Sequence, residues 1–207
     1  MIALLNHLFE RPPDAPETRC YAGLTAQARR AEFYRWWGVP DTLEGRFELL
    51  ALHAFLILHR LKRQGEEARR FSRRLFEVMV ADVDGLGPGP WLDESPAVPP
   101  VRALARGCNR RLHAYDSGLE AGADSAVSVG GGPLVIALSR NLYRTKAVPG
   151  PVTAGMAAYV GNSVTLLTKQ PLERVLAGGV RFPEPPIPAW ASAASWLAAY
   201  RIGQGGM

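Results

Sequence analysis

The longest apolar periodic segment of the chain runs from residue 42 to residue 61 and follows a short turn. Its apolar side chains recur at steps of three and four residues, the pattern of a buried helix. One stripe holds Leu43, Phe47, Leu50, Ala54, Ile57 and Leu61, and a second holds Leu49, Leu52 and Leu56. Only a narrow face remains for Glu44, Glu48, His53 and Arg60. We therefore predict that this helix lies at the centre of the fold, with neighbours on most sides.

The turn before this segment carries the signals of a helix N-terminus. Pro40 fixes the chain ahead of the helix, and either Asp41 or Thr42 can accept hydrogen bonds from the first free backbone N–H groups. Asp41 and Glu44 have the spacing of a capping box, with Asp in place of Ser or Thr. Gly38 is suited to ending the preceding helix in the left-handed conformation. The central helix should begin near Thr42.

A second helix is predicted from residue 66 to about residue 84, directly after a break at Gly65. One face carries its apolar side chains, Ala68, Phe71, Leu75, Val78 and Met79. Because the connection is short, the two helices should be antiparallel neighbours. Further helices are predicted for residues 1–9, 25–37, 101–120, 133–144, 152–169 and 171–177, and no segment shows the sustained alternation of a β-strand. The fold class is therefore all-α, a single helical domain built around a central antiparallel helix pair, with an extra C-terminal segment.

Composition suggests three parts along the chain. We interpret residues 1–19 as an N-terminal helix and linker, residues 20–184 as the helical domain, and residues 185–207 as an apolar tail. The N-terminus lacks the features of a signal peptide, and no run reaches the roughly 20 apolar residues of a transmembrane helix. Cys20 and Cys108 lack metal-ligand spacing and fit a reducing cytosol, while a disulfide between them stays open.

Several runs of the sequence resemble one known family. The run GVPDTLEGRFELLALHAFLILHRLK is followed by LFEVMVADVD and, much later, by LSRNLY and GVRFPEP. In this order they resemble the ubiquinol–cytochrome c chaperone family, whose members assist assembly of cytochrome b into respiratory complex III. The resemblance covers residues 20–184 and is dense from residue 33 to residue 84. It implies a helical, non-enzymatic chaperone without a cofactor, which binds nascent or newly inserted cytochrome b and is cytoplasmic and peripherally associated with the inner membrane.

The family motif also marks residues with an expected structural role. They are Gly38, Pro40, Asp41, Gly45, Arg46, Phe47, His53, Asp82 and Asp84. Asp82 and Asp84 lie near a helix C-terminus, where the helix dipole disfavours negative charge, so a partner such as Arg46 is expected in a buried or half-buried ion pair. After Asp84 the chain departs from the family pattern, because residues 85–100 are rich in proline and glycine. The ribosome and a small helical protein are further candidate partners.

Basic residues cluster in two places. The net charge is +5, and residues 60–74 contain seven basic and two acidic side chains, a difference equal to that net charge. The candidate partner-binding residues are Arg69, Arg70, Arg73 and Arg74 in this segment, and Arg102, Arg106 and Arg110 in a second row with steps of four. These rows are either solvated faces or surfaces that bind ribosomal RNA or anionic lipid head groups, both of which are fixed arrays of negative charge.

The sequence contains no clear catalytic or metal-binding motif. His53 and His59 are six residues apart and point in different directions from a helix, so they cannot share a metal ion. One alternative to the chaperone is an enzyme acting on a quinone-like lipid, which would need His53, Asp82 and Arg46 around an open pocket. Another alternative is a helical RNA- or ribosome-binding module.

The tail beyond residue 184 has three interpretations. Its bulky side chains are mainly aromatic, and no charged residue lies between residue 185 and Tyr200. Trp190, Trp196 and Tyr200 are therefore candidate membrane contacts, because aromatic rings with a polar group favour the membrane–water interface. The other two interpretations are that the tail docks on its own domain and that it contacts a partner protein.

Overall fold

The computed structural model describes residues 14–83, 107–123, 132–144, 148 and 150–188. Within these ranges every regular element is a helix, which confirms the predicted all-α class. The helices are α2 (Pro16–Ala28), α3 (Ala31–Arg35), α4 (Leu43–Leu61), α5 (Glu66–Val83), α7 (Cys108–Ala123), α8 (Pro133–Asn141), α9 (Gly150–Thr168) and α10 (Leu172–Leu176).

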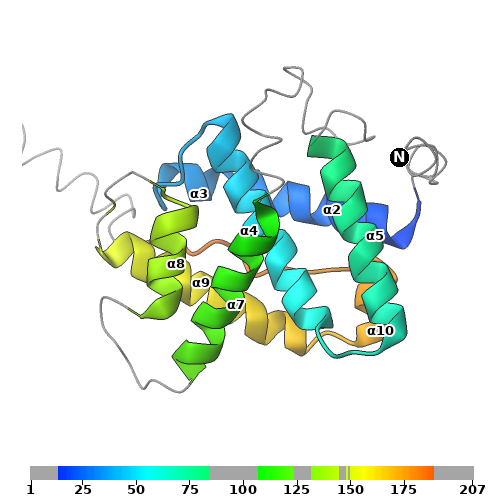
Figure 1. The fold of residues 1–207 in the computed structure, drawn as a ribbon. Coiled ribbons are helices and arrows are strands. Elements are labelled where there is room, and N and C mark those ends of the chain that lie inside the picture. Colours follow the sequence, from blue (N-terminus) through cyan, green and yellow to red (C-terminus); the bar gives the residue numbers. More distant parts are fainter. Residues whose placement is uncertain (1–13, 84–106, 124–131, 145–147, 149, 189–207) are drawn as a thin grey trace, which may run out of the picture.

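Helix α4 lies at the centre of the fold, in contact with α2, α5, α7 and α9 (Figure 1). All members of its two apolar stripes are buried except Leu43, which is partly buried. The predicted polar face is largely covered too, because Glu48 and His53 are both 0% exposed. The prediction of a central helix is confirmed. The neighbours of α4 also enclose two of its ionisable side chains, Glu48 and His53.

The turn before α4 explains several residues of the family motif. Thr42 is the N-cap, since its side chain accepts a hydrogen bond of 3.2 Å from the Gly45 backbone N–H. Gly38 has a φ of +65°, the left-handed conformation expected for it. A Cβ at Gly45 would lie 2.0 Å from the Pro40 carbonyl oxygen, so the close turn requires glycine there.

Helices α4 and α5 form the predicted antiparallel pair, joined by residues 62–65 (Figure 1). The predicted apolar face of α5, from Ala68 to Met79, is buried. Helix α2 packs against both members of the pair. The N-terminal half of the chain is therefore a compact set of helices built on α4.

The predicted helix over residues 25–37 is wrong. Residues 16–28 form α2 and residues 31–35 form α3, with Arg30 extended between them at a φ of −62° and a ψ of 127°. In one straight helix Ala28 and Phe33 would point about 140° apart. The break between the helices allows both side chains to be fully buried.

The other predicted helices correspond to α7, α8, α9 and α10, with shifted ends. Residues 1–9 and 85–100 lie outside the described residues. Helix α2 begins at Pro16, so the predicted end of the linker at residue 19 falls inside a helix. Cys20 and Cys108 are buried free thiols. None of the described helices is both long and apolar enough to cross a bilayer.

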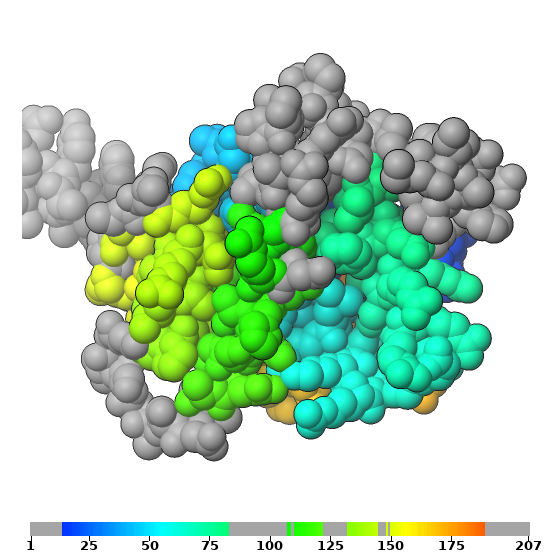
Figure 2. Space-filling view, viewed as in Figure 1, coloured from blue at the N-terminus to red at the C-terminus, as the bar shows by residue number. Residues whose placement is uncertain are grey.

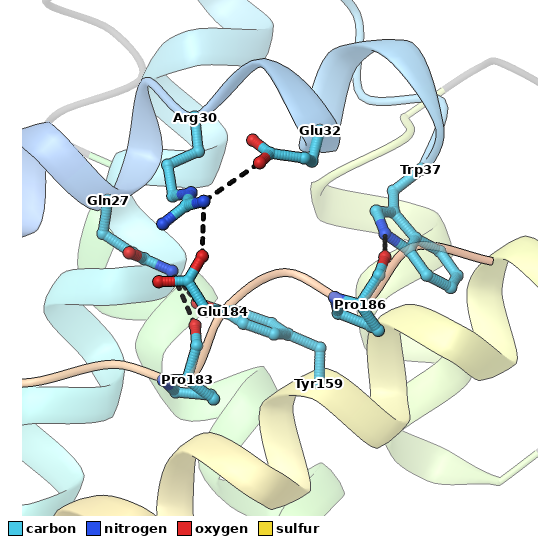
Figure 3. Close-up of polar contacts among 8 residues, drawn as sticks. All are labelled: Gln27, Arg30, Glu32, Trp37, Tyr159, Pro183, Glu184 and Pro186. Atoms are coloured by element: carbon cyan, nitrogen blue, oxygen red, sulfur yellow. Dashed lines mark hydrogen bonds and ion pairs between the residues drawn. The ribbon is translucent and has the colours of Figure 1, made fainter. Parts of the chain in front are cut away.

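After α10 the chain crosses the domain without regular secondary structure. We call residues 181–188 the strap. It lies near α2, α3 and α9 (Figures 1 and 3), and both Pro185 and Pro188 are buried. The first residues of the predicted tail therefore dock on their own domain. Trp190, Trp196 and Tyr200 lie outside the described residues, so their contact with a membrane stays a prediction.

Candidate functional site

Four arginines follow the outer side of α5, and we call Arg69, Arg70, Arg73 and Arg74 the α5 basic face. All four are exposed. Glu66, one turn earlier, pairs with Arg69 and, at 3.7 Å, with Arg70. Because the Arg69 and Arg70 side chains remain 73% and 65% exposed, these pairs leave the guanidinium groups open to a partner. Figure 2 shows α5 at the surface of the molecule.

Other basic residues of the same sequence segment have packing roles. Arg60 donates to the carbonyl oxygens of Leu167 and Gln170 at 2.9 and 3.1 Å, and so caps the C-terminal end of α9. Lys62 pairs with Asp116 and Glu120 on α7 at 2.5 and 2.9 Å. In the second row, Arg110 is exposed on α7, and Arg102 and Arg106 lie outside the described residues.

An open cleft of about 440 Å³ adjoins the α5 basic face, where α2, α5 and α10 meet. It is lined by Pro16, Glu17, Glu67, Arg70, Phe71, Arg74 and Leu176. Two members of the α5 basic face therefore turn toward a concave surface that also carries carboxylates. Such a surface offers both donors and acceptors to a polar segment of a partner protein.

A second pocket, of about 190 Å³, lies between α4 and α7. Its lining residues are Phe55, Leu58, His59, Lys62, Leu112, His113 and Asp116. His59 Nδ1 lies 2.8 Å from Asp116 Oδ1. Sequence reasoning did not bring His59 and His113 together, because they come from different helices and no local spacing relates them. Among the described residues, no cluster of three potential ligands could hold a metal ion.

His53 belongs to the core and not to a reactive site. Its Nδ1–H donates to the Leu49 carbonyl oxygen at 2.8 Å, and its Nε2 accepts from the Tyr159 hydroxyl at 2.8 Å. This tautomer follows because a carbonyl oxygen can only accept. The rings of Phe33 and Phe182 pack edge-on against the imidazole. Burial lowers the pKa of His53 to about 4, so the ring is neutral at neutral pH.

Asp82 and Arg46 lie in different surroundings. Asp82 is 1% exposed, and its Oδ2 accepts from the Tyr21 hydroxyl at 2.7 Å. Arg46 pairs with Asp41 at 2.8 Å, and 45% of its side chain is exposed. Asp84 lies outside the described residues, and its pairing with Arg46 stays a prediction. Neither pocket described above is lined by His53, Asp82 or Arg46.

A buried ion pair connects α4 to α7. Arg111 Nε lies 2.7 Å from Glu48 Oε2, with the two side chains 15% and 0% exposed. Burial raises the pKa of the Glu48 carboxyl, and the Arg111 guanidinium opposes that shift. In the sequence, Arg111 directly follows Arg110, the last residue of the second basic row. Its partner is 63 residues away along the chain, so no local pattern could reveal the pair.

Comparison with known proteins gives two matches. Residues 35–182 match the family described as ubiquinol-cytochrome C chaperone. A solved structure titled "Crystal structure of the Cbp3 homolog from Brucella abortus" is similar over 89% of this chain and 97% of that chain, with 30% sequence identity and a TM-score of 0.66. No protein of curated function matches the sequence significantly.

Proposed function

This chain belongs to the ubiquinol–cytochrome c chaperone family, and we propose that it is a non-enzymatic assembly chaperone for cytochrome b of respiratory complex III. The observation that carries the proposal is the family match over residues 35–182, which includes the whole central helix pair. The shared fold and 30% identity with the Cbp3 homolog from Brucella abortus support it. Removing the chain from its native cell and measuring complex III activity tests it.

The distribution of polar groups supports a binding role. Glu48, His53 and Asp82 are buried and hydrogen-bonded to other helices or to their own backbone, so they serve the core. The large apolar side chains exposed on the described surface are Ile136 and Ile187. An apolar helix of a membrane client would gain little by burial against two separate side chains. We therefore propose that this part of the chaperone binds polar, extramembrane segments of newly made cytochrome b.

We also propose that the protein acts in the cytoplasm, in peripheral contact with the inner membrane. The α5 basic face supports such a location, because each basic residue near an anionic membrane contributes about 1 kcal/mol of binding free energy. Ribosomal RNA offers the same fixed negative charge near the site of synthesis. A ribosome and a small helical protein remain proposed partners in this scheme.

Reversing the charge of Arg69, Arg70, Arg73 and Arg74 to Glu should weaken binding to an anionic surface by at least about 100-fold at low salt, because four attractive contacts become repulsive. The measurements are cosedimentation of the purified full chain with phosphatidylglycerol vesicles and with ribosomes. Loss in one of the two assays identifies the surface that the α5 basic face binds.

The matched control reverses four exposed basic residues elsewhere, Arg35, Arg140, Lys169 and Arg174, and so makes the same change in net charge. It should retain most of the binding. Circular dichroism should be the same for all three proteins. If the α5 variant cosediments as the wild type does in both assays, the α5 basic face is only a solvated surface.

A further inference from the structure

Every third residue of the strap faces the domain. Pro185 and Pro188 are buried and Phe182 is partly buried, whereas Arg181, Glu184 and Ile187 are exposed. Three residues per turn is the repeat of a polyproline II helix. Prolines at positions 183, 185, 186 and 188 favour this conformation, because each fixes its own φ and restricts the preceding residue to extended geometry. The burial pattern and the prolines therefore indicate a polyproline II conformation, with one face of the strap toward the domain.

The domain holds the strap by its backbone carbonyl groups (Figure 3). Gln27 Nε2 on α2 donates to the Pro183 carbonyl oxygen at 3.0 Å, and Trp37 Nε1 donates to that of Pro186 at 2.8 Å. These two carbonyls are again three residues apart. At the start of the strap, the Gln170 side chain donates to the Arg181 carbonyl at 2.8 Å and accepts from the Arg181 N–H at 3.0 Å.

We call the surface under the strap, which Gln27, Trp37 and Tyr159 help to form, the groove. Its donors are also held in place by contacts that do not involve the strap. A Cβ at Gly155 would lie 1.9 Å from Trp37 Cζ3, so the indole rests directly on the α9 backbone. Gln27 Nε2 also lies 2.9 Å from the Tyr159 hydroxyl, which in turn donates to the buried His53. The groove is thus a fixed set of side-chain donors beside aromatic rings. Aromatic-lined grooves of this kind are a general means of binding proline-rich segments.

Besides the buried Pro185 and Pro188, two side chains of the strap make specific contacts. Phe182 packs on His53 with ring centroids 5.1 Å apart, and Glu184 pairs with Arg30 at the surface. The remaining hydrogen bonds go to backbone groups, which any extended chain could supply. Arg30, at the edge of the groove, adds a preference for an acidic residue. It pairs with Glu184, which lies between two prolines of the strap.

We propose that this groove is a binding site for an extended, proline-rich segment of a partner protein with an acidic residue between its prolines, and that the strap is an intramolecular competitor for the same site. The charge of Arg30 and the carbonyl-directed donors define this partner. The proposal goes beyond the assembly function, since it concerns a peptide site whose occupancy can be measured on the purified chain.

The test uses the full chain and a fluorescein-labelled peptide with the sequence of residues 179–188, followed by fluorescence anisotropy. A double variant, Phe182→Ala with Glu184→Lys, weakens the strap and leaves the groove intact. Because a tethered competitor has an effective concentration in the millimolar range, this variant should bind the peptide at least about tenfold more tightly than the wild type does. Should the double variant unfold, Glu184→Lys alone provides the comparison, with a smaller gain of the same sign.

Groove variants made in the strap-weakened chain test the donors. Gln27→Leu keeps the side-chain volume and should reduce peptide affinity between about twofold and tenfold, the effect of one hydrogen bond. Trp37→Phe should do the same, while Trp36→Phe, the matched control, should not. A peptide in which alanine replaces all four prolines should bind more weakly.

Two results would overturn the proposal. The first is equal peptide binding by the wild type and the folded strap variant, or by the proline and alanine peptides. The second is a wild-type dimer in sedimentation equilibrium that the strap variant abolishes, which would make the strap of a second copy the occupant in place of a partner protein.

Discussion

Replacing Arg111 with Met should lower the free energy of unfolding by about 3–5 kcal/mol at neutral pH. The reason is that Glu48 is 0% exposed, and its Oε2 loses the guanidinium that lies 2.7 Å away. Its other oxygen, Oε1, makes no hydrogen bond in the structure. A buried carboxylate without a countercharge is strongly destabilising. Denaturant unfolding followed by circular dichroism measures the loss.

Two further results are expected only if Glu48 and Arg111 form this buried ion pair. The pKa of Glu48 is already raised by burial, and removing Arg111 must raise it further. Since a raised carboxyl pKa means that the folded state binds a proton more tightly than the unfolded state, the deficit should shrink as the pH falls and Glu48 becomes neutral. The double variant Glu48→Leu with Arg111→Met should recover most of the stability. A loss below about 1 kcal/mol for Arg111→Met alone would contradict the buried pair.

Lowering the pH from 7 to 4 should cost about 3 kcal/mol of stability through His53, of which about 2 kcal/mol falls between pH 7 and pH 5. His53 is 0% exposed, and its pKa is lowered from 6.5 to about 4. The unfolded chain therefore gains a proton before the folded chain does. The stability contributed by the neutral imidazole is complete above pH 6.5 and is lost as the pH falls from 6.5 to about 4.

His53→Gln isolates this contribution, because an amide can donate and accept at the same site without titrating. The measurement is the change in unfolding free energy between pH 7 and pH 5 for both proteins. It should be smaller in the variant by about 2 kcal/mol. His113→Gln, which removes an exposed histidine, controls for the loss of a histidine as such. Equal pH dependence in the wild type and His53→Gln would show that His53 is not buried as described.

Sequence reasoning succeeded where the relevant contacts are local. The stripes of α4, its start at Thr42 and its antiparallel neighbour α5 follow from helical period, capping and the short connection. The break between α2 and α3 was missed, because residues 25–37 contain no proline or strong stop signal at Arg30. The break allows Ala28 and Phe33 to be buried together.

Contacts between distant segments could not be predicted from the sequence. Glu48 with Arg111 and His53 with Tyr159 are separated by 63 and 106 residues, and both depend on how α7 and α9 pack on α4. The charge count over residues 60–74 includes Arg60 and does not reveal that its guanidinium caps α9. The α5 basic face was predictable, since it needs only exposure and helical spacing.

Of the three interpretations of the C-terminal tail, the structure supports docking on the domain for its first residues. Docking on the domain accounts for residues 185–188, where Trp37 donates to the Pro186 carbonyl oxygen and where Pro185 and Pro188 are buried. The sequence could not indicate this site, because the donors Gln27 and Trp37 are 156 and 149 residues away in sequence from the prolines whose carbonyl oxygens they bind. Contact of Trp190, Trp196 and Tyr200 with a membrane is a separate prediction about residues beyond the strap.

The most direct test of the account is deletion of this chain from its native cell, with quantification of cytochrome b and complex III activity in isolated membranes. Re-expression of the wild-type chain controls for indirect effects, and succinate dehydrogenase activity reports on the rest of the respiratory membrane. The account predicts that cytochrome b and complex III activity fall together, that succinate dehydrogenase is retained, and that re-expression restores both. Normal levels of cytochrome b and of complex III activity in the deletion strain would contradict it.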